Sequence, residues 1–120
     1  MKKLLSFISI FIFSTSLSAM TADTILEFHE GNELDKQIAY IAMHNAGEAI
    51  AWTNLIFEDQ HGVKLFCEPP KHVFSGEEYF NLFKDFYKYA QDNGFYDDEN
   101  MPIPVSMVLL PAFIAKYKCD

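Results

Sequence analysis

The side chains best suited to binding a metal lie in the middle of the chain. His61, Cys67 and His72 follow one another in one short stretch, while His29 and His44 lie nearer the N-terminus. Structural zinc sites use closely spaced ligand pairs such as C-x2-C or H-x3-H, and neither pair occurs here. The sequence therefore predicts no metal site, and no cofactor-binding motif is present.

Glu77 and Glu78 are the clearest pair of acids for general acid–base chemistry. A glycosidase pair must face each other across a cleft, whereas adjacent residues of a helix point apart. The chain has no G-x-S-x-G elbow, no glycine-rich phosphate loop and no H-E-x-x-H motif. His44 precedes Glu48 by one helical turn, which favours a hydrogen-bonded surface pair. We therefore predict no catalytic residues and a protein that is not an enzyme.

Cys67 and Cys119 are the two cysteines of the sequence. Two cysteines in a small exported domain usually pair, and a bridge closing so long a loop stabilises by roughly 4 kcal/mol on the chain-entropy model. The alternative is a reactive thiol, which needs an activating base or cation. Nothing in the sequence indicates such a group, so the pairing favours a disulfide.

The third group of chemically interesting residues is the acidic run Asp97, Asp98 and Glu99. It follows no calcium-binding spacing, so it is either a solvated loop or a contact for a basic partner. The whole chain carries a formal charge of −8. This charge disfavours binding to nucleic acid or anionic lipid and would attract a basic protein.

The first nineteen residues have the order of a secretory signal peptide. Lys2 and Lys3 precede an apolar run over 4–13, and small or polar residues dominate 14–19. The apolar run is shorter than the roughly 20 residues that a spanning helix needs. We therefore expect residues 1–19 to be cleaved, with the cut close to Ala19. Loss of the two lysines changes the formal charge from −8 to −10.

The periodicity of apolar residues, together with turn and capping residues, predicts helices in the rest of the chain. A short helix over 25–29 precedes the turn Gly31-Asn32, and a long helix is expected over 33–57. Its expected stripe comprises Leu34, Ile38, Ile41, Ala42, Ala46, Ala49, Ile50 and Thr53. Gly47 interrupts this helix and is tolerated best where a neighbour packs closely.

The C-terminal half has sharper helix signals. Ser75 and Glu78 form a capping box for a helix over 76–92, which Asn93-Gly94 ends. A last helix should run from Pro104 to Cys119, with Pro104 in its first turn. The expected stripe of the capped helix is Tyr79, Phe80, Leu82, Phe83, Phe86, Tyr87 and Ala90. The prediction is an all-α, three- to four-helix domain over 23–120 with one disulfide, after a cleaved signal peptide.

Three motifs resemble those of a known family. The segment 66–69 resembles F-C-x-P, the segment 104–119 resembles a P-A-x-x-L-V-x-x-A-L-x-x-A-F-P-C ending, and Tyr40-Ile41 resembles part of C-x-G-Y-I. In order and spacing, these motifs are similar to those of the Rap/Tai family of type VI secretion immunity proteins. The resemblance covers roughly residues 25–119.

The resemblance implies a small helical periplasmic protein that binds a cognate peptidoglycan amidase effector and occludes its active site. It implies a disulfide between Cys67 and Cys119, which agrees with the pairing argued above, and it implies a homodimer. The acidic residues Asp97, Asp98 and Glu99 are then candidate contacts of the effector. Two alternatives stay open: a general periplasmic binding or acid-stress chaperone module, and a cell-wall enzyme.

Overall fold

The computed structural model describes residues 20–96 and 101–120, and in these ranges the chain folds into four α-helices without a strand. The helices are α2 (Ala22–His29), α3 (Glu33–His61), α4 (Gly76–Asp92) and α5 (Val105–Lys116). The fold class is therefore all-α with one disulfide, as predicted. The predicted signal segment 1–19 lies outside the described residues. Within the described part, none of the helices has the length and hydropathy needed to cross a membrane.

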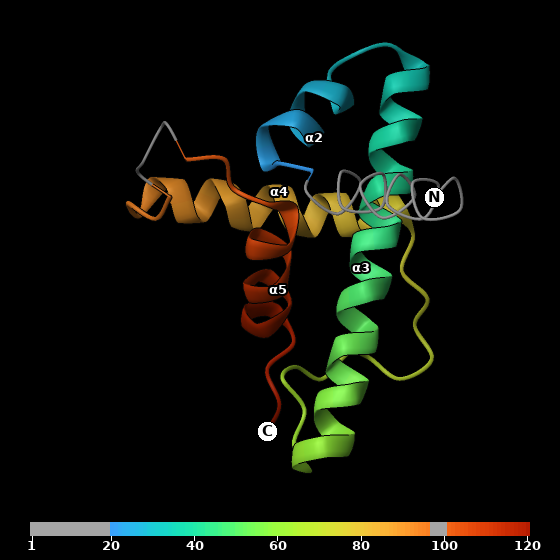
Figure 1. Ribbon diagram of the computed structural model, residues 1–120, viewed down its shortest axis with the longest axis vertical. Helices are drawn as coiled ribbons and strands as arrows, with labels where there is room; N and C mark the ends of the chain where they lie inside the picture. The colour runs from blue at the N-terminus through green and yellow to red at the C-terminus, as the bar shows by residue number, and fades with distance from the viewer. Residues whose placement is uncertain (1–19, 97–100) are drawn as a thin grey trace, which may run out of the picture.

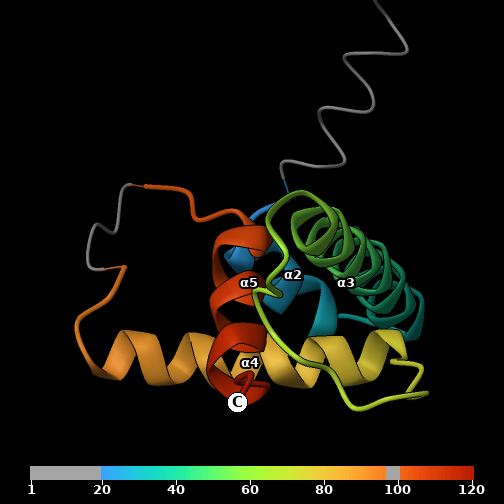
Figure 2. The ribbon, with the colours of Figure 1, turned by 90° about the horizontal axis from the view of Figure 1, so that it is seen from below.

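The helix α4 runs across both α3 and α5 and forms the base on which the other helices pack (Figures 1 and 2). It begins at the predicted capping box: the Glu78 N–H donates to the Ser75 hydroxyl at 3.1 Å, and the Ser75 N–H donates to Glu78 Oε1 at 3.2 Å. It ends at Asp92 with Asn93 as its C-cap, and Gly94 follows with a positive φ of 80°. The predicted bounds 76–92 are confirmed.

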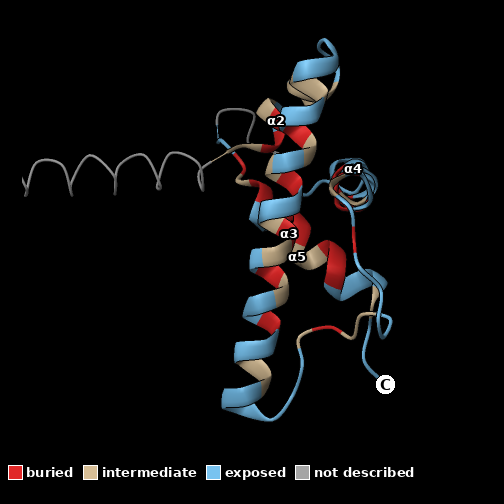
Figure 3. Ribbon diagram, turned by 90° about the vertical axis from the view of Figure 1, so that its right-hand side faces the viewer, coloured by how far each residue is buried: buried red, intermediate tan, exposed pale blue. Residues whose placement is uncertain are grey.

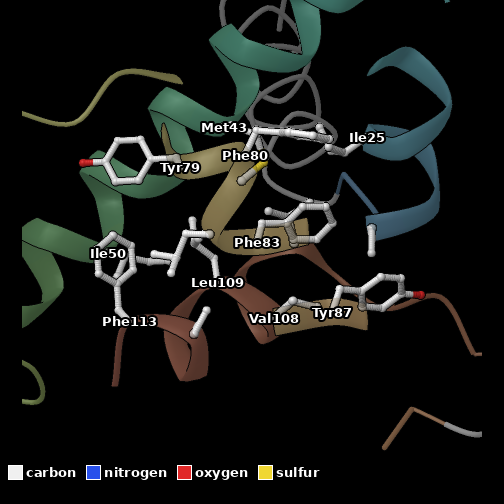
Figure 4. Packing of buried hydrophobic residues seen from close by; sticks show 14 of the residues in the cluster. Ile25, Met43, Ile50, Tyr79, Phe80, Phe83, Tyr87, Val108, Leu109 and Phe113 are labelled. Carbon is white, nitrogen blue, oxygen red and sulfur yellow. The ribbon is translucent and has the colours of Figure 1, made fainter. Parts of the chain in front are cut away.

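An aromatic core fills the space between α4 and the other helices (Figure 4). Its largest fully buried side chains include Tyr79, Phe80 and Phe83 of α4 and Phe113 of α5. Phe66, in the loop between α3 and α4, is also fully buried. The rings of Phe66 and Phe113 stack at 4.8 Å between centroids. Burying rings of this size dominates the stability of so small a domain.

Two glycines allow α3 and α4 to approach closely. A side-chain carbon at Gly47 of α3 would overlap the ring of Tyr79, and one at Gly76 of α4 would overlap the carbonyl oxygen of Tyr40. The glycine inside α3 is therefore explained by packing. Glycine destabilises a helix by about 1 kcal/mol relative to alanine. It is nevertheless required at this position, because the Tyr79 ring occupies the space that a side chain would fill.

The helix α3 is longer than predicted. It continues through His61, so the expected end at 57 was wrong. The stop signal is Gly62, whose φ of 75° suits glycine and whose N–H donates to the Glu58 carbonyl at 2.7 Å. Glu58 and Gln60 before it have favourable helix propensities, which helps to continue the helix.

The first and last helices also differ from their predicted bounds. The short helix begins at Ala22, earlier than 25, because the Thr21 hydroxyl accepts a hydrogen bond from the Thr24 N–H. The last helix begins at Val105 with Pro104 as its N-cap and ends at Lys116, short of the predicted Cys119. Tyr117 leaves helical geometry, and Cys119 then turns toward Cys67.

The segments that enter α2 and α5 lie side by side. Thr21 and Pro104 form an isolated antiparallel bridge, in which the Ala22 N–H donates to the Ile103 carbonyl at 2.8 Å. The Val105 N–H donates in turn to the Met20 carbonyl at 3.1 Å. This bridge joins the start of α2 to the start of α5.

Candidate interaction surfaces

The disulfide joins Cys67 to Cys119, with a Cα–Cα distance of 5.1 Å. The backbone reinforces it, because the Cys67 N–H donates to the Tyr117 carbonyl at 2.7 Å. Asn54, which is buried on α3, fixes the same segment: its amide nitrogen donates to the Phe66 carbonyl at 2.9 Å, and its oxygen accepts from the Leu65 N–H at 2.7 Å. The pairing predicted from sequence is confirmed, and no thiol remains free in the described residues.

The remaining candidates for chemistry have structural partners. Nε2 of His72 lies 2.7 Å from Oε2 of Glu78, and this hydrogen bond, with that from the Ser75 N–H, lowers the pKa of Glu78. The adjacent Glu77 lies in the first turn of α4, where the helix dipole favours an acid. Over residues 20–96 and 101–120, no three His, Cys, Asp or Glu side chains gather in a way that could hold a metal.

The predicted hydrogen bond between His44 and Glu48 was wrong. The hydroxyl of Tyr79 donates to Glu48 Oε1 at 3.2 Å, across the contact between α3 and α4. Burial, and then the nearby Glu48 carboxylate, raise the pKa of Tyr79, so the hydroxyl stays protonated and can donate. Tyr79 could not be inferred from the sequence as the partner of Glu48, because it comes from another helix.

The buried stripe predicted for α3 was also largely wrong. The residues that face the core are Ala39, Met43, Gly47, Ile50 and Asn54. Of the eight predicted residues, Ile50 is buried and Ala42 and Ala46 are partly buried, whereas Leu34, Ile38, Ile41, Ala49 and Thr53 are exposed. Ala39 and Gly47 face the core where α4 approaches closely. Most of the other large apolar residues of α3 project on the opposite side.

This opposite side, which we call the outer face, is apolar along most of α3. Its large side chains are between 38% and 69% exposed: Leu34, Ile38, Ile41, Trp52, Leu55 and Ile56. In Figure 3, α4 and α5 lie on the same side of α3, and buried and exposed residues alternate along that helix. An apolar patch this long on one helix is typical of an interaction surface.

A second surface, which we call the α4–α5 groove, lies between those two helices. One part has a volume of about 370 Å³ and is lined by Leu82, Asp85, Phe86, Tyr89, Ala112, Ala115 and Lys116. A smaller part of about 160 Å³ shares Leu82, Asp85 and Lys116 with it and extends to Glu78 and Asn81. Aromatic rings and charges of both signs therefore line one continuous groove. Phe86, predicted to be buried, is only partly buried because it lines this groove.

A third hollow, between α3 and α5, has a volume of about 450 Å³. Its lining is mainly apolar and includes Ile50 and Thr53 of α3 with Met107, Leu110 and Pro111 of α5.

The predicted contact residues Asp97, Asp98 and Glu99 lie outside the described residues. Tyr96, which precedes them, has a positive φ of 62°, and its hydroxyl donates to the Met107 carbonyl at 2.9 Å. In a regular helix, the N–H of residue 111 would take that carbonyl, but Pro111 has none. The hydrogen bond therefore connects the start of the acidic loop to α5.

The surfaces on α3 and along α4–α5 are the functional candidates that the sequence reading missed. A signal for the first was present, because Leu34, Ile38, Ile41, Trp52 and Leu55 fall on one seven-residue pattern. The buried residues Met43, Gly47, Ile50 and Asn54 fall on another. Comparison with known proteins adds no assignment, since no protein-family model, curated protein or solved structure matches the chain.

Proposed function

We propose that this protein is a periplasmic immunity protein of the Rap/Tai type, which binds and inhibits a peptidoglycan amidase effector of a type VI secretion system. The observation that carries the proposal is the bridge between Cys67 and Cys119 in an all-helical domain. These are the two positions that the resemblance pairs, at the F-C-x-P segment and at the end of the last helix.

The proposed mechanism is occlusion without catalysis. The capped helix α4, the disulfide and the Asn54 hydrogen bonds hold the surface in one conformation, which lowers the entropy lost on binding. The α4–α5 groove offers the partly buried Phe86 and the exposed Tyr89 as anchors beside Asp85. Aromatic anchors with a charged rim are common where a protein binds another tightly.

The negative net charge of the chain favours association with a basic partner. The formal charge of −8 creates a negative field that raises the rate of association with a positively charged hydrolase. Asp97, Asp98 and Glu99 follow Tyr96, close in sequence to the end of α4. We propose that this loop and the α4–α5 groove contact the same partner.

The same proposal requires that the protein be exported to the periplasm. The signal segment 1–19 would direct the chain to the periplasm, where the disulfide can form and where the wall-cutting effector acts. Expression of the full chain, followed by mass measurement of the periplasmic form, tests this step. A product that begins near Ala19 or Met20 supports export, and an uncleaved cytoplasmic product contradicts it.

A pull-down tests the function itself. The oxidised protein, purified from the periplasm, is coupled to a resin and exposed to lysate and secreted fraction of the producing strain. We expect stoichiometric capture of one peptidoglycan hydrolase whose activity falls on binding. Failure to capture a hydrolase that is demonstrably expressed would leave the resemblance as one of fold only.

The alternative is a general periplasmic binding or acid-stress chaperone module, and the exposed outer face of α3 is the observation that favours it. A chaperone of this kind should loosen in acid and bind an apolar dye while losing near-UV dichroism. Unchanged dichroism and dye binding through the acid range would count against it.

A further inference from the structure

The two parts of the α4–α5 groove meet at two side chains of opposite charge. Asp85 of α4 and Lys116 of α5 line both the larger and the smaller part, together with the buried Leu82. The larger part continues to the rings of Phe86 and Tyr89, and the smaller part continues to an acidic and an amide side chain. The groove therefore combines an aromatic end and a more polar end with two opposite charges where these ends join.

Small side chains of α5 keep the larger part open. Ala112 and Ala115 are the residues of α5 that line it beside Lys116, and an alanine leaves space that a larger side chain would fill. On the α4 side, Tyr89 is 59% exposed and Phe86 is partly buried, with 6.1 Å between their ring centroids. The larger part can therefore accept an apolar side chain from a partner.

Asp85 and Lys116 are both available to a partner. Both side chains are exposed, and within residues 20–96 and 101–120 neither takes part in an ion pair. Glu78, the other acid of the groove, is hydrogen-bonded to His72 and to the Ser75 N–H. The two free charges face one groove from different helices, so each can pair with a group of opposite sign on the same partner.

We propose that the α4–α5 groove binds a segment of the hydrolase in which a basic and an acidic side chain flank an apolar one. The basic group pairs with Asp85, the acidic group pairs with Lys116, and the apolar side chain enters the larger part between Phe86 and Ala112. This inference rests on the proposed function and deepens it, because it states the chemistry that the hydrolase presents to the groove.

Lys116 is then a specificity-determining residue. The formal charge of −8 attracts any basic protein, so attraction by net charge does not select one hydrolase among several cationic proteins. A segment with basic side chains only would place a like charge beside Lys116, which disfavours binding. Net charge thus sets the rate of association, and the groove selects the segment that stays bound.

Two lysine variants separate these effects. Lys116→Glu and Lys118→Glu change the net charge equally, and Lys118 follows α5 and lines neither part of the groove. We expect Lys116→Glu to raise the dissociation constant of the hydrolase captured in the pull-down by roughly tenfold, chiefly through faster dissociation. Lys118→Glu should bind at least as tightly as wild type. Equal effects of the two variants, or tighter binding by Lys116→Glu, would overturn the proposal.

Filling the groove tests the apolar contact. Ala115→Phe, at an exposed residue, should weaken binding of the captured hydrolase by roughly tenfold or more, because the ring occupies the larger part. Ala49→Phe, at an exposed alanine of α3, is the matched control and should bind as wild type does. Thermal unfolding of both variants shows that they are folded. Wild-type affinity of a folded Ala115→Phe protein would contradict the proposal.

Peptides test the groove without the hydrolase. The blocked peptides Lys-Leu-Glu and Lys-Leu-Lys are titrated into isotope-labelled protein, and backbone amide shifts are followed by NMR. The mixed-charge peptide should shift the amides of Asp85, Tyr89 and Ala115 more than the basic peptide does, and equal or absent shifts would overturn the proposal. If wild type inhibits the hydrolase but Lys116→Glu does so equally well, the immunity function stands and this inference fails. If wild type captures no hydrolase, the proposed function itself fails.

Discussion

The outer face of α3 and the α4–α5 groove are both rich in apolar side chains, but they differ in charge and shape. The outer face is a convex helix with a single charged residue between Lys36 and Glu58. The groove is concave and combines Phe86 and Tyr89 with Asp85 and Lys116. The groove, which combines aromatic anchors with charged side chains, is the surface proposed above to contact the basic partner.

The disulfide ties the loop before α4 to the segment after α5, so its loss should destabilise the domain. Replacing Cys67 and Cys119 by Ser should lower the free energy of unfolding by about 2–5 kcal/mol, because the unfolded chain gains freedom. Urea unfolding of the double variant beside the oxidised wild-type protein measures this. A variant that keeps wild-type stability would show that the bridge is not a structural support.

The close contact of α3 and α4 can be broken at Gly47. Replacing Gly47 by Ala should destabilise the fold by about 1–3 kcal/mol, because the new methyl group overlaps the Tyr79 ring. Thermal unfolding measures the change. Thr53→Ala, at an exposed residue of the same helix, is the control and should stay within about 0.5 kcal/mol of wild type. Equal stability of the two variants would refute the packing role of Gly47.

Charge reversal in the α4–α5 groove should weaken the proposed contact with the hydrolase. Asp85→Lys should slow association with the hydrolase by roughly tenfold at low salt and less at high salt. Reversing Asp97, Asp98 and Glu99 together should act in the same direction. Stopped-flow measurements at two ionic strengths test both, with Glu27→Lys on α2 as the control. An unchanged association rate would remove the altered residues from the proposed contact.

The smallest effect is expected from pH at His29, which lies on neither surface. Its ring stacks on Phe80 at 3.9 Å, and burial, followed by Lys36 and Lys84, lowers its pKa, against the opposing effect of Glu30 and Glu77. The unfolded chain, with an ordinary histidine pKa of about 6.5, then binds the proton more readily. Stability should therefore fall as the pH drops below about 6.5, until the folded-state pKa is passed.

His29→Gln should reduce this pH dependence, whereas His61→Gln, at an exposed histidine of α3, should leave it unchanged. Unfolding curves between neutral and mildly acidic pH provide the measurement. If the stability of both variants depends on pH as that of the wild type does, His29 is not the source of the acid sensitivity. The acid-stress alternative would then lose the titrating group that most directly supports it.

Several features of this protein were determined by the sequence alone. The helix α4 was predicted to the residue, because local signals agree: a capping box at Ser75 and Glu78, one apolar stripe, and Asn93-Gly94 at its end. The all-helical class and the pairing of Cys67 with Cys119 were likewise predictable. In each case the information is local, or only two candidates exist.

Tertiary structure decided which face of α3 is buried. Both faces of that helix carry apolar residues, so periodicity alone could not choose between them. The choice came from the close approach of α4, which only the faces of Gly47 and Ala39 permit. The partner of Glu48, the hydrogen bonds of Asn54 and the bond from Tyr96 to Met107 were also undetermined, because each joins residues from different segments. The surfaces proposed for function follow from these contacts, since the side of α3 that packs on α4 leaves the larger side chains exposed to solvent.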